Sequence, residues 1–391
     1  MTLITGIAGT SRKENEHRLP IHPQHLGRIP EALRPHLRFE RGYGRRFGLS
    51  AAELETRCGG LLERDELLAA CDLVVLPKVM PEDLLAMREG AVHWGWPHCV
   101  QQREITQAAI DRRLTLIAFE AMYHWLRSGA RGVHSFSRNN ELAGYCSVLH
   151  AFELLGIDGH YGPRRRAAVL GFGAVSRGAV YALQGRGVFD ITAYTQRSTQ
   201  RVRDRIFGCR HLKMRRSAGG RGMKAVLDDG TSEPLADHLA RADVIVNGTL
   251  QDPQRPLMYL GDGEVERLKP GCLIVDVSCD LGMGFPFARP TSFEDPIFEV
   301  QGGSAPRCAG PPAIYYGVDH TPSYLWDAAT WEISEGLLPY LPAVMEGPEG
   351  WARIPALERA VEIRDGVVRN PTILSFQGRE EAYPHRVRGG A

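Results

Sequence analysis

The sequence lacks the features that mark membrane, secreted or metal-dependent proteins. No apolar run in the 391 residues approaches the roughly 18 that span a bilayer, and the N-terminus has no signal-peptide pattern. The eight cysteines are scattered singly with no CxxC pair, which argues for reduced thiols and against a zinc site or a disulfide framework. We therefore expect a cytoplasmic protein with no membrane partner and no metal.

An excess of charge of one sign is also absent. The chain has 47 basic and 46 acidic side chains, a net charge of +1, so nothing favours nucleic acid as a partner. Lysine itself is scarce, because only five of the 47 basic residues are lysines. A lysine between two hydrophobic elements, such as Lys78, therefore calls for a functional reason. The length is sufficient for two domains with separate cores.

A glycine-containing segment is the main motif. Residues 167–170 are a short apolar run that predicts a buried parallel strand, and residues 171–178, GFGAVSRG, lead from it into a helical pattern. Such glycines let the backbone turn tightly and approach a pyrophosphate, which would bind the free N–H groups at the helix start. An ordinary strand-to-helix turn is the alternative, but residues 190–194 follow at the distance of the second strand of a βαβ unit. The candidate cofactor-binding residues here are Gly171, Gly173, Ala174 and Val175.

The end of that second strand bears on which dinucleotide binds. An NAD site usually has an acid there, whereas residues 194–199 read YTQRST. Arg197 can pair with a 2′-phosphate and Ser198 can donate to it. An arginine on a solvated loop is the alternative. The segment favours NADP(H) as cofactor over NAD(H).

The N-terminal part predicts a second parallel α/β domain. Apolar runs at residues 3–8, 71–76, 92–95 and 114–119 alternate with polar or helical sequence. Ligands gather at the carboxyl ends of parallel strands. The polar residues just beyond such ends are Arg18, Lys78, His98 and Glu120.

The rest of the chain predicts the remainder of the nucleotide-binding domain. A helix over residues 139–155, capped by Asn139 or Asn140, leads into it, and three further strands are expected at residues 244–248, 272–277 and 314–318. We expect the basic insert at residues 201–230 to be a solvated excursion. A helix at residues 326–338 would return the chain to the first domain, and the polar tail after residue 371 would follow the surface.

These motifs, in this order, resemble the alanine dehydrogenase/transhydrogenase family from residue 3 to about 345. The segments that carry the resemblance are ENEHRLPIHP, LVVLPKVMPEDL, GWPHCVQ, IAFE, NNELAGY, VLGFGAVSRGA, VIVNG, LIVDVSCDLG, EDPIF and VDHTPS. The resemblance implies an α/β fold of two Rossmann-like domains with parallel sheets, an interdomain active-site cleft and homo-oligomers. The substrate domain would comprise residues 1–138 and 324–391, and the dinucleotide-binding domain residues 139–323.

The resemblance also implies roles for single residues. Arg18 would hold the carboxylate of a keto acid, Lys78 would bond its carbonyl or carboxylate, and His98 would transfer a proton. Asp280 would lie at the cofactor face, with Asn247, Gly248 and His320 at the cofactor. Ordinary structural roles are the alternatives: Arg18 pairing on the surface, His98 as a core histidine and Asp280 as a loop acid. Glu120 is expected to support the site by pairing with an arginine.

Three departures from the alanine dehydrogenases favour the opine-forming branch of the family. These are Arg197 in place of an acid, His320-Thr321 in place of Asn-Met, and the lack of a glycine-rich segment after the Glu120 strand. We therefore expect an NADPH-dependent, opine-type synthase that condenses a pyruvate-like 2-keto acid with the amino group of an ornithine-like or lysine-like amino acid. The alternatives are an alanine dehydrogenase, which uses ammonia, and a non-catalytic NADP(H)-binding sensor.

Overall fold

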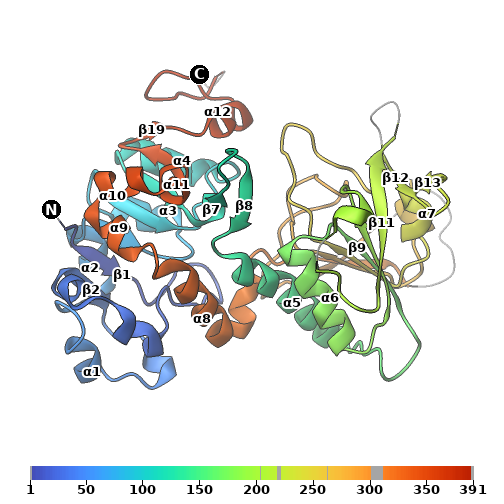
Figure 1. The fold of residues 1–391 in the computed structure, drawn as a ribbon, viewed down its shortest axis with the longest axis horizontal. Coiled ribbons are helices and arrows are strands. Elements are labelled where there is room, and N and C mark those ends of the chain that lie inside the picture. The colour runs from blue at the N-terminus through green and yellow to red at the C-terminus, as the bar shows by residue number, and fades with distance from the viewer. Residues whose placement is uncertain (1, 203, 218–221, 262, 301–310, 389–391) are drawn as a thin grey trace. The chain divides into compact units, whose positions relative to one another are not determined.

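The computed structural model describes residues 2–202, 204–217, 222–261, 263–300 and 311–388. Its elements form two compact units: unit 1 comprises residues 1–137 and 326–391, and unit 2 comprises residues 138–325 (Figure 1). Each unit is built on its own sheet with helices around it, so the predicted α/β fold class is confirmed.

Unit 1 contains an eight-stranded sheet in the order β19-β18-β6-β5-β4-β1-β2-β3. The six strands from β3 to β6 are parallel, whereas β18 and β19, from the C-terminal part of the chain, are antiparallel. The strand order reverses between β1 and β4, which is where open parallel sheets bind ligands. The strands of the sheet are β1 (Thr5–Ile7), β2 (Leu37–Glu40), β3 (Leu61–Leu62), β4 (Leu73–Val75), β5 (Val92–Gly95), β6 (Thr115–Ala118), β18 (Val361–Arg364) and β19 (Val367–Val368).

The helices of unit 1 are short and flank the sheet strands in sequence. Strands β7 (Tyr123–Trp125) and β8 (Arg131–His134) form a separate hairpin. The helices are η1 (Pro23–Arg28), η2 (Glu31–His36), η3 (Arg45–Phe47), α1 (Ala51–Glu55), α2 (Arg64–Ala70), α3 (Pro81–Ala86), α4 (Arg103–Asp111), η4 (Phe119–Ala121), α8 (Trp326–Leu337), α9 (Leu341–Glu346), α10 (Pro348–Arg353), α11 (Pro355–Glu358) and α12 (Pro371–Gln377).

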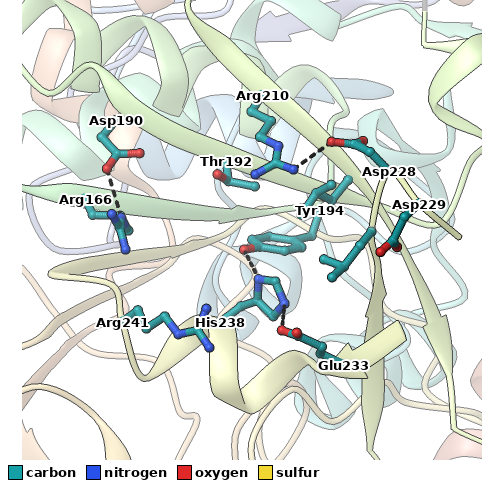
Figure 2. Close-up of a pocket in the computed structure, with 12 residues that line it drawn as sticks. Arg166, Asp190, Thr192, Tyr194, Arg210, Asp228, Asp229, Glu233, His238 and Arg241 are labelled. Carbon is teal, nitrogen blue, oxygen red and sulfur yellow. Dashed lines mark hydrogen bonds and ion pairs between the residues drawn. The ribbon is translucent and has the colours of Figure 1, made fainter. Parts of the chain in front are cut away.

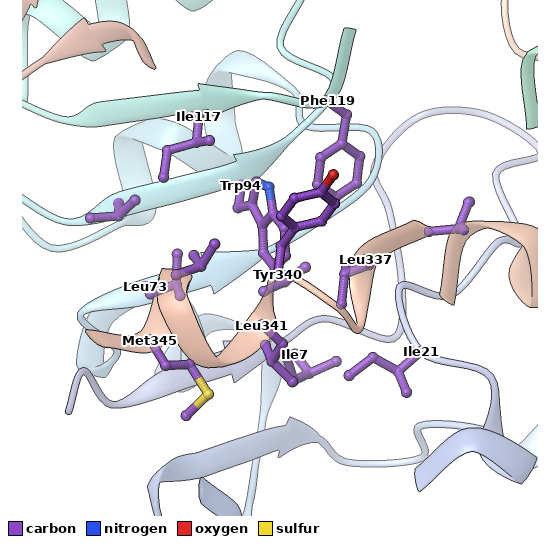
Figure 3. Packing of buried hydrophobic residues seen from close by; sticks show 14 of the residues in the cluster. Ile7, Ile21, Leu73, Trp94, Ile117, Phe119, Leu337, Tyr340, Leu341 and Met345 are labelled. Atoms are coloured by element: carbon purple, nitrogen blue, oxygen red, sulfur yellow. The ribbon is translucent and has the colours of Figure 1, made fainter. Parts of the chain in front are cut away.

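The core of unit 1 joins the two ends of the chain. Strands β1, β4, β5 and β6 are buried at every residue, as expected of parallel strands covered on both faces. In Figure 3, Leu337 and Leu341 from the returning helices lie in one apolar cluster with Ile7 and Trp94. Burial of each such side chain contributes roughly 1.5–3 kcal/mol. The helix that begins at Trp326 therefore belongs to unit 1 through its core contacts.

The prediction that the polar tail follows the surface is wrong for part of its length. Residue 371 begins α12, at whose end Gln377 is buried and donates from Nε2 to the carbonyl of Cys99 (2.6 Å). Arg379 is also buried and donates to Gln377 Oε1 (2.7 Å) and Gln107 Oε1 (2.8 Å). Buried polar groups are tolerated when they are hydrogen-bonded, and a polar sequence does not reveal such partners.

Unit 2 contains a nine-stranded sheet in the order β13-β12-β11-β10-β9-β14-β15-β17-β16. The six strands from β11 to β17 are parallel, and the order reverses between β9 and β14 as in doubly wound nucleotide-binding sheets. The strands are β9 (Arg166–Leu170), β10 (Asp190–Thr195), β11 (Cys209–Arg216), β12 (Met223–Val226), β13 (Ser232–Pro234), β14 (Val244–Asn247), β15 (Leu273–Asp276), β16 (Ile297–Val300) and β17 (Ala313–Tyr316). The helices are α5 (Ser137–Leu154), α6 (Ala174–Gly185), η5 (Thr199–Arg201), α7 (Leu235–Leu239), η6 (Val265–Arg267) and η7 (Thr321–Leu325).

The basic insert is part of this sheet, so its prediction as a solvated excursion is wrong. Strand β11 pairs in parallel with β10, and β12 pairs antiparallel with β11. Met214 and Ala225 face the core from these two strands. The exposed arginines between the apolar positions obscured the strand pattern in the sequence.

Helices α5 and α6 lie side by side (Figure 1) and touch through their backbones. A Cβ atom at Gly144 would lie 1.8 Å from the Val175 carbonyl oxygen, and one at Gly178 would lie 1.8 Å from the Glu141 carbonyl oxygen. Helix α5 begins at Ser137, so the prediction of an asparagine cap at 139 or 140 is wrong. The close contact fixes α6, and with it the start of the glycine loop.

We predict that Gly178→Ala destabilises the protein, because the added methyl group must push α5 and α6 apart. The cost should be on the order of 2 kcal/mol or more, the scale of overpacking. Gly185→Ala, in the same helix but with no atom within 4 Å of the new methyl group, should raise stability by about 0.5–1 kcal/mol. Urea unfolding measures both variants, and equal stabilities would contradict the packing described.

Candidate active site

The predicted substrate-binding side chains of unit 1 follow neighbouring parallel strands. Lys78 comes after β4, His98 after β5 and Glu120 after β6, so all three lie beyond the same edge of the sheet. The His98 N–H donates to Glu120 Oε1 (2.7 Å), and His98 Nδ1 lies 3.8 Å from the same oxygen. The expected arginine partner of Glu120 is therefore replaced, in the contacts described, by His98.

Glu120 is placed to hold a proton at neutral pH. The pKa of Glu120 is raised to about 8, mainly by burial and also by the charge of Glu362, although the His98 N–H and the charge of Lys78 act in the opposite direction. Its Oε2 atom is buried with no hydrogen-bond partner among the described residues. A carboxyl group with a raised pKa beside a histidine is typical of general acid–base sites.

His98 has an unusual backbone. Its φ of 48° lies in the left-handed region, which costs energy for any residue other than glycine and concentrates at functional sites. The bond from its N–H to Glu120 holds this conformation. Sequence reasoning identified the histidine but could not foresee this coupling.

Arg18 is buried, which excludes the alternative of a surface pair. Its Nε donates to Glu16 Oε1 (2.8 Å), its Nη2 pairs with Glu16 Oε2, and its guanidinium carbon lies 5.3 Å from the Trp96 ring centroid. Glu16 therefore fixes the orientation of Arg18 and offsets part of its charge. Trp96 connects Arg18 to the segment that carries His98.

In unit 2, the glycine loop lies where the strand order reverses. Gly171 has a φ of 90°, and Gly248, after β14, donates its N–H to the Leu170 carbonyl (3.1 Å). A Cβ atom at Gly248 would lie 2.6 Å from Ser176 Oγ. Glycine is therefore favoured at both positions, because the backbone here packs closely against Ser176.

The start of α6 fits a dinucleotide phosphate. Gly173 is the N-cap residue and offers no side chain to the first N–H groups of the helix, which begins with Ala174 and Val175. A Cβ atom at Gly173 would meet nothing within 4 Å. An uncapped helix N-terminus beside an open glycine is suited to bind an anion.

A buried polar network that sequence reasoning missed holds Asn247 in place. Asp276, fully buried at the end of β15, accepts hydrogen bonds from Asn247 Nδ2 (2.9 Å), the Cys279 N–H (3.0 Å) and Tyr315 Oη (3.0 Å). Burial raises the pKa of Asp276 to about 7 against these three bonds, and the charge on Asp280 adds to the shift. The network fixes the residues that follow β14 and β15.

The end of β10 contacts the glycine loop directly. Arg197 is exposed, and its Nη2 donates to the Phe172 carbonyl (2.9 Å). Ser198 is the N-cap residue of η5. Arg197 therefore borders the loop that we propose for the cofactor, and Ser198 follows it in the chain.

His320 is less clearly placed than the other candidates. It is buried after β17, its Nδ1 lies 2.7 Å from Asp319 Oδ1, and its ring packs against Phe293. These contacts belong to the far part of the sheet rather than to the glycine loop. Its predicted role at the cofactor stays a prediction.

Unit 2 also has a groove of about 570 Å³ on which no predicted site residue lies. Figure 2 shows its charged groups pairing with one another, as in Arg166 with Asp190 and Arg210 with Asp228. Arg166 and Asp190 begin β9 and β10, so this end of the groove is opposite to the carboxyl ends. Parallel sheets bind their ligands at the carboxyl ends, and we assign the groove no role in the reaction.

The described ranges contain no group of three metal-binding side chains and no helix long and apolar enough to cross a membrane.

Two family models match this chain, one over its N-terminal part and one over its C-terminal part. Models described as alanine dehydrogenase/PNT, N-terminal domain, and alanine dehydrogenase/PNT, C-terminal domain, match residues 9–143 and 158–371. The N(5)-(carboxyethyl)ornithine synthase of Clostridium botulinum is 26% identical over 341 residues, or 82% of this chain and 88% of that protein. The alanine dehydrogenase of Mycolicibacterium smegmatis is 23% identical over 390 residues, or 93% and 94%.

Two solved structures share the fold. An L-alanine dehydrogenase has a TM-score of 0.69 at 18% identity, covering 95% of this chain and 98% of its own. A transhydrogenase from Sinorhizobium meliloti has a TM-score of 0.64 at 18% identity, covering 94% and 99%.

We predict that Asp276 makes the protein less stable as the pH rises. Below about pH 4 the carboxyl group is protonated in both the folded and the unfolded chain, so it adds no pH dependence to the free energy of unfolding. Between that pH and about 7 the folded chain keeps a proton that the unfolded chain has lost, so the free energy of unfolding falls through this window. Asp276→Asn should make this fall smaller than in the parent, as measured by urea unfolding at pH 5 and pH 8; the rest of the fall is expected from Glu120, whose pKa is also raised.

The exposed Asp228→Asn serves as the control and should keep the parent dependence on pH. If Asp276→Asn and the parent lost the same stability between the two pH values, Asp276 would not be the titrating group.

Proposed function

Because the chain belongs to the alanine dehydrogenase/PNT family, we propose that it is an NADPH-dependent, opine-type synthase similar to N5-(carboxyethyl)ornithine synthase. It is an NAD(P)-dependent oxidoreductase. The proposed reaction condenses a 2-keto acid such as pyruvate with the amino group of an amino acid such as ornithine or lysine. Water leaves as the imine forms, a hydride from the cofactor then adds to the former carbonyl carbon, and the product is a secondary amine.

The observation that carries this proposal is the cluster of Lys78, His98 and Glu120 beyond one edge of the unit 1 sheet. A keto acid enters as an anion and needs a cation to hold it. Arg18 is paired with Glu16, and we assign the attraction for the keto acid to Lys78 and Arg18 together. In the proposal, Arg18 orients the carboxylate, for which its fixed guanidinium plane is suited.

The proton chemistry is assigned to His98 with Glu120 as its support. Loss of water from the carbinolamine requires a proton on the departing oxygen, and an imidazole is a suitable donor near neutral pH. Glu120 positions His98 through its backbone N–H and holds a proton of its own. The pair can therefore supply a proton without building up a buried charge.

The cofactor would be held by the glycine loop of unit 2 and would supply the hydride. The phosphates would rest on the start of α6, and Asn247, Gly248 and Asp280 would border the nicotinamide end; of these three, Asn247 is held by its bond to Asp276. We further propose that the enzyme acts in the cytoplasm, since the scattered cysteines are typical of proteins with reduced thiols. We also propose that it is a homo-oligomer that acts on small-molecule substrates, as the family resemblance implies.

Ammonia in place of the amino acid would make the enzyme an alanine dehydrogenase, which the M. smegmatis relative favours by its longer match. One experiment separates the two candidates: the enzyme is incubated with NADPH and pyruvate plus ornithine, lysine or ammonia, and products are identified by mass. A secondary amine formed with ornithine or lysine supports the synthase. Alanine as the only product would replace it with the second candidate.

We predict that Lys78→Met lowers keto-acid turnover by about 100-fold or more, the scale of losing one preorganised charge. The methionine keeps the length of the side chain and removes the ammonium group. NADPH binding should be unchanged, because the dinucleotide is assigned to unit 2. Lys269→Met, which removes a half-exposed lysine paired with Asp243, should keep the parent rate. Steady-state kinetics and NADPH fluorescence titration measure the two quantities.

We predict that His98→Ala flattens the pH dependence of turnover near neutrality while NADPH binding is kept. In the parent, turnover should fall as the pH rises, since the proposed proton donor is then lost. A variant with the parent profile at a lower rate would assign His98 a structural role only.

We predict that the parent binds NADPH more tightly than NADH and that Arg197→Asp reverses the preference. The substitution turns an attraction for the 2′-phosphate into a repulsion. Isothermal titration with both nucleotides measures the effect. Equal affinities of the parent for NADPH and NADH would contradict the assignment of the cofactor.

A further inference from the structure

The segment that follows β10 carries a local excess of positive charge. Residues 196–226 contain ten lysines and arginines and a single acid, Asp204, whereas the whole chain is balanced at 47 to 46. The proposed reaction uses only Arg197 from this segment. Charge concentrated in this way attracts an anion, and the structure indicates where the anion would lie.

Two guanidinium groups contact the glycine loop at Phe172, and a third arginine, Arg205, is held by the segment beside it. Arg197 Nη2 donates to the Phe172 carbonyl (2.9 Å), and Arg177, on the second turn of α6, places its guanidinium carbon 5.2 Å from the centroid of the Phe172 ring. His211, on β11, packs edge-on against the same ring at 4.4 Å. Burial lowers the pKa of His211, and the positive charges of Arg205 and Arg177 act in the same direction.

Main-chain carbonyl groups hold these arginines in place. Arg177 Nη1 donates to the Asp204 carbonyl (2.7 Å), and Arg205 Nη2 donates to the Thr199 carbonyl (2.6 Å). Among the described residues, no carboxylate pairs with Arg177, Arg197 or Arg205, so no carboxylate offsets their charge. His211 adds a buried polar atom, Nε2, that has no hydrogen-bond partner among the same residues. A buried polar atom without a hydrogen-bond partner destabilises the folded protein, and a bound ligand could supply that partner.

We propose that Arg177 and Arg205, together with Arg197, form the site for a phosphate ester, the 2′-phosphate on the adenosine ribose of the dinucleotide. This inference rests on the cofactor in the proposed function. The site lies at the carboxyl end of β10, where doubly wound folds place that ribose. A dianion there would face three guanidinium groups that are already oriented by the backbone, which limits the entropy lost on binding. The basic insert thereby has a role: it supplies Arg205 and, through His211, the wall behind Phe172.

Isothermal titration of the full chain without substrates, at fixed ionic strength, tests the site. The probes are 2′,5′-ADP, 5′-ADP and inorganic phosphate. We expect 2′,5′-ADP to bind the parent at least about 10-fold more tightly than 5′-ADP, and inorganic phosphate to bind more weakly than either. Arg205→Gln and Arg177→Gln should each weaken 2′,5′-ADP about 10-fold, as expected for one charged hydrogen bond, and leave 5′-ADP unchanged.

Arg210→Gln is the matched control, because Arg210 lies in the same basic segment but is exposed and pairs with Asp228. It should leave the affinities for both nucleotides unchanged. Equal binding of 2′,5′-ADP and 5′-ADP by the parent would overturn the proposal. An equal loss with Arg210→Gln would also overturn it, because the attraction would then be diffuse. Arg205 is exposed on a loop, so its variant remains informative if Arg177→Gln fails to fold.

The binding experiment tests the phosphate site independently of the proposed reaction. Preference for 2′,5′-ADP without formation of a secondary amine would keep this site and remove the synthase. Formation of a secondary amine at equal rates with NADH and NADPH, with no preference for 2′,5′-ADP, would do the reverse.

Discussion

Close approach of the backbone at the switch point of the unit 2 sheet is the constraint on which the proposed cofactor site depends. Gly171 adopts a positive φ, Gly248 leaves no room for a side chain beside Ser176, and Gly144 and Gly178 bring α5 and α6 into backbone contact. These contacts place the uncapped start of α6 directly after β9. A side chain at these positions would displace the helix, and with it the N–H groups that are suited to a phosphate.

In unit 1 the corresponding constraint is electrostatic. The carboxyl ends of β4, β5 and β6 are followed by a cation, an imidazole and a half-buried acid, and the left-handed backbone of His98 is held by Glu120. The raised pKa of Glu120, about 8, favours a protonated carboxyl group near neutral pH, and the proposed proton transfer at His98 relies on this. The Glu16–Arg18 pair avoids an unpaired buried charge, because Glu16 orients the guanidinium group of Arg18 and offsets part of its charge.

The sequence predicted the parts of this protein that depend on local pattern. Apolar runs identified β1, β4, β5, β6, β9, β10, β14, β15 and β17, and polar residues at their ends identified Lys78 and His98. It could not predict the Asp276 network, because Asn247 and Tyr315 are 29 and 39 residues away and meet Asp276 only when the strands pair. The basic insert and Gln377 were misread for a related reason: their burial depends on partners distant in sequence.

The central claim is that this enzyme reduces an imine made from a keto acid and an amino acid. The most direct test uses NADPH that carries deuterium at the transferred position of the nicotinamide, with pyruvate and ornithine or lysine as substrates. The account predicts a secondary amine one mass unit heavier than its unlabelled counterpart, with the deuterium on the carbon that was the keto carbon of pyruvate. Deuterium found only in alanine or lactate, or none transferred at all, would contradict it.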